Sequence, residues 1–146
     1  MSDARSADLA ALLLRLTLGM AFIAHAMLKV FVFTMPGTVA FFESLGLPGF
    51  TGWLVMLAEL GGGIALILGV QVRLVALLLL PIMLGATWSH AGNGWLFTGT
   101  GGGWEYPAFW TATVAVQALL GAGAYALRVP GLPEILRVGG PGTVRA

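Results

Sequence analysis

Three titratable residues stand inside long apolar stretches, where a charge is costly. Glu59 lies near the middle of residues 53–70, and His25 and Lys29 lie near the end of residues 9–33. A carboxylate in hydrocarbon must face a partner or a wet cavity. His25 and Lys29 share a helix face because they are four residues apart. A carboxylate near an imidazole and an ammonium can hold and transfer protons, so these are the candidate catalytic residues.

The positions along the two stretches predict that these three side chains meet. At a helical rise of ~1.5 Å per residue, His25 lies ~12 Å below the boundary set by Phe33. By the same rise, Glu59 lies ~9 Å below the boundary set by Trp53. The two stretches run antiparallel if they follow one another across a membrane. His25, Lys29 and Glu59 are then at matching depth on adjacent antiparallel helices, and we expect them to form one buried polar cluster.

Each residue also has a structural interpretation. Lys29 can extend its ammonium to the outer headgroups, and Arg15 can do the same on the opposite side as an anchor. A Glu59–Lys29 ion pair can fix helix packing without doing chemistry. His25 can be a hydrogen-bonded core histidine. The glycines at 61–63 are expected to serve close helix packing.

Aromatic and polar residues near one end of the chain's apolar stretches could form the walls of a site. All five tryptophans fall at the predicted outer ends of helices or in the loop 89–106. The loop is bracketed by two titratable residues, His90 and Glu105. The last apolar stretch carries a stripe of polar and small residues at helical spacing: Trp110, Thr113, Gln117, Gly121 and Ala124. The expected ligand-binding residues are Trp88, His90, Trp95, Trp104, Glu105, Trp110 and Gln117.

Other chemistries are not favoured. Residues 99–103, GTGGG, lack the following Lys-Ser/Thr of a phosphate loop. His25 and His90 differ in depth, which argues against bis-histidine haem ligation. A two-histidine, one-carboxylate metal site would need the loop to fold inward by ~10 Å, so no metal is expected.

The composition bounds the class of protein. Of 146 residues, 58% are hydrophobic and 9% are charged, with a mean hydropathy of +0.94. Soluble domains carry about 25% charged residues, so this is a polytopic membrane protein in contact with the lipid bilayer. A net charge of +1 argues against nucleic acid. The absence of cysteine excludes disulfides and thiol chemistry, so a redox role would need a cofactor such as a quinone, or a partner.

The expected fold is all-α, a transmembrane four-helix bundle with a short interfacial helix between helices 1 and 2. The expected spans are 9–33, 53–70, 74–88 and 107–127, and the interfacial helix falls in 34–50. Ser6 or Asp8 could cap the first span. Pro81 should kink or locally unwind the third. Residues 1–128 would form the transmembrane domain, and 129–146 a partly disordered cytoplasmic tail.

The basic residues predict the orientation. With four spans, one side of the membrane holds six of the seven basic residues, and Lys29 alone falls on the other. By the positive-inside rule both termini are cytoplasmic, in a bacterial inner membrane. The six residues are Arg5, Arg15, Arg73, Arg128, Arg137 and Arg145.

An ordered series of short motifs resembles the DoxX family over about residues 12–127. The series is His25-x-x-x-Lys29, Phe42 with Gly46-Leu47-Pro48, Glu59-Leu60-Gly61-Gly62, Leu68-Gly69 with Arg73, Met83, Gly94-Trp95 and Gly103-Trp104-Glu105. The resemblance implies a four-helix inner-membrane bundle with cytoplasmic termini. Relatives in that family include subunits of thiosulfate:quinone oxidoreductases and members of membrane complexes with superoxide dismutase and a sulfurtransferase.

The sequence leaves three functions open. The leading one is an accessory or quinone-interacting subunit of a membrane oxidoreductase system. His25 or Lys29 would donate a hydrogen bond to the quinone carbonyl, and Glu59 would relay the proton. The alternatives are a non-catalytic binder or transporter of a small lipophilic molecule, and a scaffold that recruits soluble enzymes. The partners would be soluble or membrane redox proteins, or a second copy of the chain.

Overall fold

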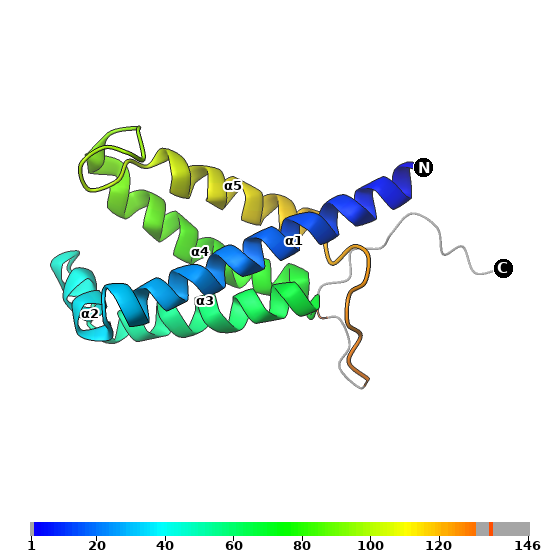
Figure 1. Ribbon diagram of the computed structural model, residues 1–146, viewed down its shortest axis with the longest axis horizontal. Coiled ribbons are helices and arrows are strands. Elements are labelled where there is room, and N and C mark those ends of the chain that lie inside the picture. The colour runs from blue at the N-terminus through cyan, green and yellow to red at the C-terminus, as the bar shows by residue number, and fades with distance from the viewer. Residues whose placement is uncertain (1, 131–134, 136–146) are drawn as a thin grey trace.

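The computed structural model describes residues 2–130 and 135, and within them the chain is helical with no strand. The first helix continues without a break into a π-helical turn. The elements in order are α1 (Asp3–Met27), η1 (Leu28–Val32), α2 (Met35–Ser44), α3 (Phe50–Leu68), α4 (Val72–His90), the 3-10 turn η2 (Ala91–Asn93) and α5 (Glu105–Leu120) (Figure 1).

Three of these helical segments are long and apolar enough to cross a membrane. They are Asp3–Val32, Phe50–Leu68 and Val72–Asn93. Only about a quarter to a third of each apolar window is buried inside the protein, between 22% and 33%. Most of their apolar surface therefore faces outward, as expected of helices whose solvent is lipid. α5 is shorter, with 16 residues.

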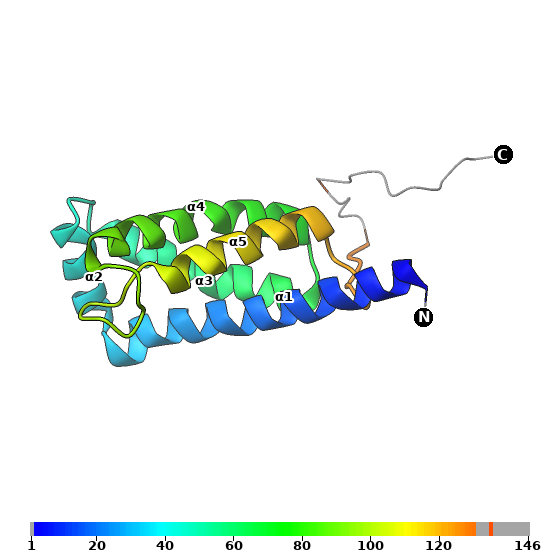
Figure 2. The same ribbon diagram turned by 90° about the horizontal axis from the view of Figure 1, so that it is seen from above.

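The helices form an elongated body. α1 packs along α3, and α4 packs along α5 (Figures 1 and 2). One end, here the α2 end, holds α2 and the loop 94–104; the opposite end holds the start of α1 and the turn between α3 and α4 (Figure 1). The core between the helices contains fully buried apolar side chains from α1, α3, α4 and α5, among them Phe22, Leu66, Leu79 and Val114.

Two glycines allow α1 and α3 to touch through their backbones. A Cβ atom on Gly63 would lie 2.8 Å from the Gly19 carbonyl oxygen, and one on Gly19 would lie 2.7 Å from the Gly63 oxygen. Gly62 instead receives the Leu79 side chain of α4, whereas Gly61 has open space around it. The expected packing role is thus confirmed for two of the three glycines at 61–63.

Two arginine side chains cap the C-terminal ends of helices. One of them, Arg15, was expected to reach the lipid headgroups. Arg15 is 1% exposed, and its guanidinium donates to the oxygens of Leu66, Ile67 and Ala124 at 2.8–3.1 Å. It therefore binds the last carbonyls of α3 instead of reaching headgroups. A cation placed there satisfies carbonyls that lack helix partners and complements the helix dipole.

The fourth predicted span ends early. α5 stops at Leu120, not Leu127, because Gly121 has the positive φ of 82° that ends helices. Arg73 donates to the carbonyls of Ala118 and Leu120 and packs against Gly121. The stripe of polar and small residues thus loses its last two members, Gly121 and Ala124, from the helix.

Two local predictions also differ from the structure. α1 begins at Asp3, so Ser6 and Asp8 lie inside the helix and neither caps it. α4 is a continuous helix through Pro81, so the helix is not unwound there, and the alternative, a kink, stays a prediction. Most of the predicted tail, including Arg137 and Arg145, lies outside the described residues.

Candidate functional site

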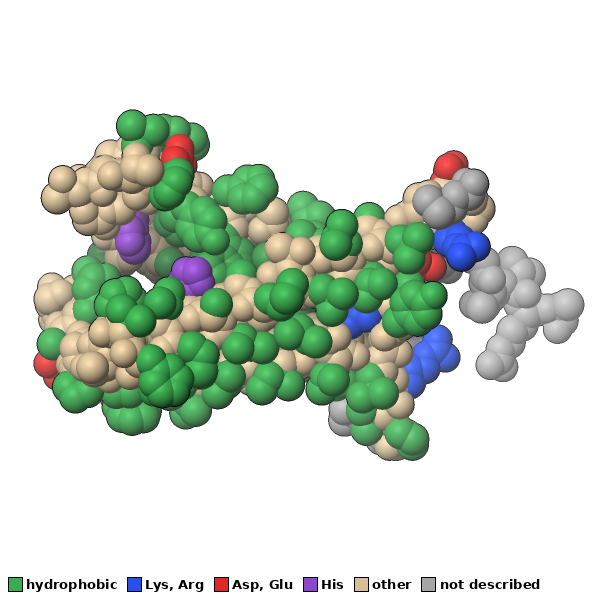
Figure 3. Space-filling view, viewed as in Figure 1, with side chains coloured by type: hydrophobic (Ala, Val, Ile, Leu, Met, Phe, Trp, Pro, Cys, Tyr) green, Lys and Arg blue, Asp and Glu red, His purple; other side chains and the backbone are tan. Residues whose placement is uncertain are grey.

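A large cavity opens at the α2 end of the molecule. Its volume is about 980 Å³, and its lining is mostly apolar. Residues of α1, η1, α2, α3, α4, the 94–104 loop and α5 all contribute to its walls. The space-filling view shows a deep hollow at this end, with both histidines, in purple, on its walls (Figure 3). Such a volume and lining suit a drug-sized apolar ligand.

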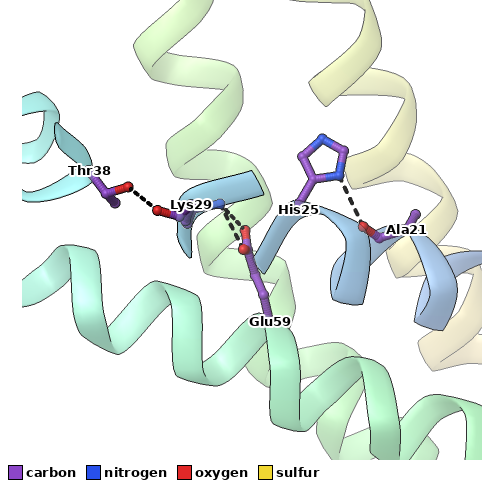
Figure 4. A network of polar contacts seen from close by, with 5 residues as sticks. All are labelled: Ala21, His25, Lys29, Thr38 and Glu59. Carbon is purple, nitrogen blue, oxygen red and sulfur yellow. Dashed lines mark hydrogen bonds and ion pairs between the residues drawn. The ribbon is translucent and has the colours of Figure 1, made fainter. Parts of the chain in front are cut away.

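Lys29 and Glu59 form an ion pair on the cavity wall. The Lys29 ammonium donates to both carboxylate oxygens of Glu59, at 2.7 and 3.0 Å (Figure 4). The Glu59 side chain is 6% exposed and the Lys29 side chain 16%. A charge at such a site is stabilised by a partner that can hydrogen-bond it. The matching depth of these two residues, read from helix rise, is confirmed.

Local structure holds Lys29 in place. It belongs to the π-helical turn η1, and such turns widen the helix and occur often at functional sites. Its carbonyl oxygen accepts a hydrogen bond from the Thr38 hydroxyl of α2 at 3.2 Å. The same residue therefore bonds α2 through its backbone and α3 through its side chain (Figure 4). Thr38 is 4% exposed, and sequence reasoning missed it because an isolated threonine carries no chemical signal.

His25 lines the same cavity but does not bond Glu59. Its Nδ1 atom bonds the carbonyl oxygen of Ala21 at 3.0 Å, and its ring points toward α5, away from the ion pair (Figure 4). There it meets the edge of Trp110, with ring centroids 4.6 Å apart, and stacks at 6.5 Å with Tyr106. The predicted three-residue cluster is therefore an ion pair plus a separate histidine within an aromatic wall.

The structure divides the expected ligand-binding residues into two groups. Trp88, His90 and Trp110 line the cavity. His90 bonds the Ala86 carbonyl at 2.8 Å and the Ser89 hydroxyl at 3.1 Å. The other four are outside the cavity lining: Trp95, Trp104, Glu105 and Gln117.

The residues of the second group have structural contacts. The rings of Trp95 and Trp104 meet edge to face at 4.5 Å within the loop. Glu105 accepts a hydrogen bond from the Phe97 backbone and braces that loop. Gln117 is fully buried and donates to the Gly121 carbonyl at 2.7 Å, just past the end of α5. Glu105 and the two loop tryptophans thus support the cavity's rim without entering it.

Sequence reasoning missed most of the apolar lining. Tyr106 joins the aromatic wall beside His25, and its position next to Glu105 at the start of α5 could have indicated it. Phe41 and Phe42 of α2 also line the cavity, although their pattern is equally typical of a helix facing lipid. Among the described residues, no group of three or more His, Cys, Asp or Glu side chains could hold a metal ion.

Comparison with known proteins places the chain in a family. The family model DoxX matches residues 10–92, which include His25, Lys29 and Glu59. A curated relative, named putative oxidoreductase CatD, of Bacillus subtilis (strain 168), is 35% identical over 82 residues. The match spans 56% of this chain and 60% of that relative, so less than two thirds of the relative is covered. No solved structure matches. The family match, the three apolar helices and the polar pair they bury identify the chain as a membrane protein of the DoxX family.

Proposed function

We propose that this protein is a quinone-interacting or accessory subunit of a membrane oxidoreductase system. In this proposal α1, α3, α4 and α5 all cross a bacterial inner membrane as a bundle, and α2 lies at its outer interface. Both termini are then cytoplasmic, and the cavity sits near the outer surface. The name of the Bacillus subtilis relative, putative oxidoreductase CatD, supports the redox setting.

The observation that carries the proposal is the cavity itself. It is about 980 Å³ in volume, apolar over most of its walls, and has the Lys29–Glu59 pair on one wall. An apolar enclosure with few polar groups is the usual form of a small-molecule site. Trp88, Trp110 and Tyr106 provide flat aromatic surfaces, which suit a planar ring.

Lys29, Glu59 and His25 would each have a different role in binding the ring, set by the contacts that each makes. Lys29 has a third N–H beyond the two that reach Glu59, and that hydrogen can bind a ring oxygen. Glu59 holds the ammonium in position and balances its charge. His25 would contact the ring from the α5 side. The three residues proposed for catalysis therefore flank the cavity, although no direct bond joins His25 to Glu59.

Ligand titration tests this function. The full chain in lipid nanodiscs is titrated with short-tailed benzoquinones and naphthoquinones while tryptophan fluorescence is recorded. We expect saturable quenching, because Trp88 and Trp110 line the cavity. Lipid extracts of the purified protein, analysed by mass spectrometry, should contain a quinone above the level in the bulk membrane.

A pair of glycine variants controls for quenching by quinone dissolved in the lipid. Gly85 lines the cavity and has open space around it, so Gly85→Phe should fill part of the cavity and weaken binding about tenfold. Gly61 also has open space but is not in the lining, so Gly61→Phe should bind normally. Equal quenching in both variants, or no saturable binding across the panel, would contradict the proposal.

A second function, non-catalytic binding of a small lipophilic molecule, is favoured by the way the three polar residues are paired. His25 bonds its own helix at Ala21 and Lys29 bonds Glu59, so among the described residues no hydrogen-bonded chain runs through all three. Saturable binding of non-quinone lipophiles, together with failure to bind quinones, would support this function over the first.

A further inference from the structure

The two cavity histidines share an arrangement that fixes where their protons lie. His25 and His90 each direct Nδ1 at the carbonyl oxygen one helical turn earlier, Ala21 and Ala86, at 3.0 and 2.8 Å. A carbonyl oxygen only accepts hydrogen bonds, so Nδ1 must carry the hydrogen in both rings. In a neutral imidazole the other nitrogen, Nε2, then has a lone pair and no hydrogen.

The Ser89 hydroxyl agrees with this assignment for His90. It donates its own hydrogen to the Ala86 carbonyl at 2.9 Å, which leaves its oxygen free to accept. That oxygen lies 3.1 Å from His90 Nδ1 and can share the Nδ1 hydrogen with the carbonyl. The opposite tautomer would place the Nδ1 lone pair against the carbonyl lone pairs, which is repulsive.

Both Nε2 atoms are therefore available as acceptors. Neither makes a hydrogen bond to any other described residue, whereas both side chains line the cavity. Contacts with Trp110 and Tyr106 on one side hold the His25 ring in its orientation. Two of the three N–H groups of the Lys29 ammonium are engaged by Glu59. Its third N–H, and the buried Nε1–H of Trp110, which has no partner among the described residues, can donate to an oxygen of either the quinone or the hydroquinone, so these donors do not distinguish the two forms.

We infer that this cavity selects the reduced, hydroxyl-bearing form of its ring ligand, a hydroquinone, over the oxidised quinone. The inference rests on the proposed function and concerns binding only. A hydroquinone O–H can donate to the lone pair of a histidine Nε2. A quinone carbonyl oxygen at the same place would face that lone pair with its own, and both acceptors would stay without a donor.

Three ligands of nearly the same shape test the inference. They are a decyl-substituted benzoquinone, its hydroquinone, and the dimethyl ether of that hydroquinone, which has no O–H. Binding to the full chain in nanodiscs is measured by calorimetry, without oxygen, at about pH 8, where an unperturbed histidine is neutral. The chain has no cysteine, so a reducing ligand breaks no disulfide. We expect the hydroquinone to bind about tenfold more tightly than either of the others.

Two histidine variants test whether His25 and His90 cause the preference for the hydroquinone. His25→Phe and His90→Phe each keep a flat ring and remove the acceptor, so each should reduce the hydroquinone preference and the double variant should abolish it. Tyr125→Phe is the matched control, since Tyr125 is 85% exposed and lies outside the cavity lining. That variant should keep the preference. His90 is at the end of α4, so its variant remains informative if His25→Phe fails to fold.

The outcomes separate this inference from the proposed function. Quinone binding that equals or exceeds hydroquinone binding overturns the inference and leaves the proposed function standing. Failure of all three ligands to bind overturns the proposed function. A hydroquinone preference that survives the double histidine variant overturns the assignment to Nε2.

Discussion

At the scale of single residues, the buried ionisable groups are each held by a specific partner. Glu59 has Lys29 at 2.7 Å, and the fully buried Arg15 has three backbone carbonyls. The first contact joins η1 to α3 on the cavity wall. The second joins α1, α3 and the chain after α5 at the opposite end. Charged side chains thus act as fixed links between helices at both ends of the molecule.

The ion pair gives a prediction for stability. Removing one partner of a buried pair costs about 3–5 kcal/mol in soluble proteins, because the other charge stays buried. Interhelical polar contacts in membranes couple more weakly, by roughly 1–2 kcal/mol at most. We expect Glu59→Gln and Lys29→Met each to lower the melting temperature, and the double variant to recover part of the loss.

A double-mutant cycle measures this coupling by thermal unfolding. Glu105→Gln serves as the control, because Glu105 braces the 94–104 loop and has no contact with Lys29. Its effect should add to that of Lys29→Met within about 0.5 kcal/mol. Zero coupling between Glu59 and Lys29 would mean that the ion pair contributes nothing to stability.

At the scale of elements, the approach of α1 to α3 decides whether the ion pair can form. Gly19 and Gly63 bring the two backbones into contact. Gly63 is one helical turn from Glu59, on the same face of α3. A side chain at this contact would push the helices apart near the point where Lys29 reaches across.

Two alanine substitutions on α3 should therefore have opposite effects. Gly63→Ala places a methyl group 2.8 Å from backbone oxygen, so it should destabilise the protein by about 1–3 kcal/mol. Gly61→Ala meets nothing within 4 Å and should stabilise the helix by about 0.5–1 kcal/mol. Thermal unfolding of the two variants in the same detergent makes the comparison. Equal loss of stability in both would contradict the close contact.

At the scale of the whole molecule, the two ends differ in chemistry. The α2 end holds the cavity, the ion pair and the aromatic rings, whereas the opposite end holds helix-capping arginines. The basic residues predict that this opposite end, with both termini, faces the cytoplasm. A reporter fused after Ala146 should then be active in the cytoplasm. Activity confined to the periplasm would reverse the orientation and place the cavity on the inner side.

The sequence by itself determined which segments are apolar helices and which polar residues share a depth. Apolar length predicts candidate spans, and the family match and three of the helices agree with it. Helix rise is nearly constant, so counting residues placed Lys29 and Glu59 at one level, and they pair.

Tertiary structure alone decided where the other side chains turn. Rotation about a helix axis and the choice of rotamer depend on neighbouring helices, which residue counting does not contain. His25 therefore turned toward Trp110 and not Glu59, and Arg15 turned inward to the end of α3. α5 ended at Leu120 because Gly121 took a positive φ beside Arg73, a contact between segments distant in sequence. The depth of a residue along the helix axis follows from the local geometry of the chain, whereas the direction of its side chain follows from packing against neighbouring helices.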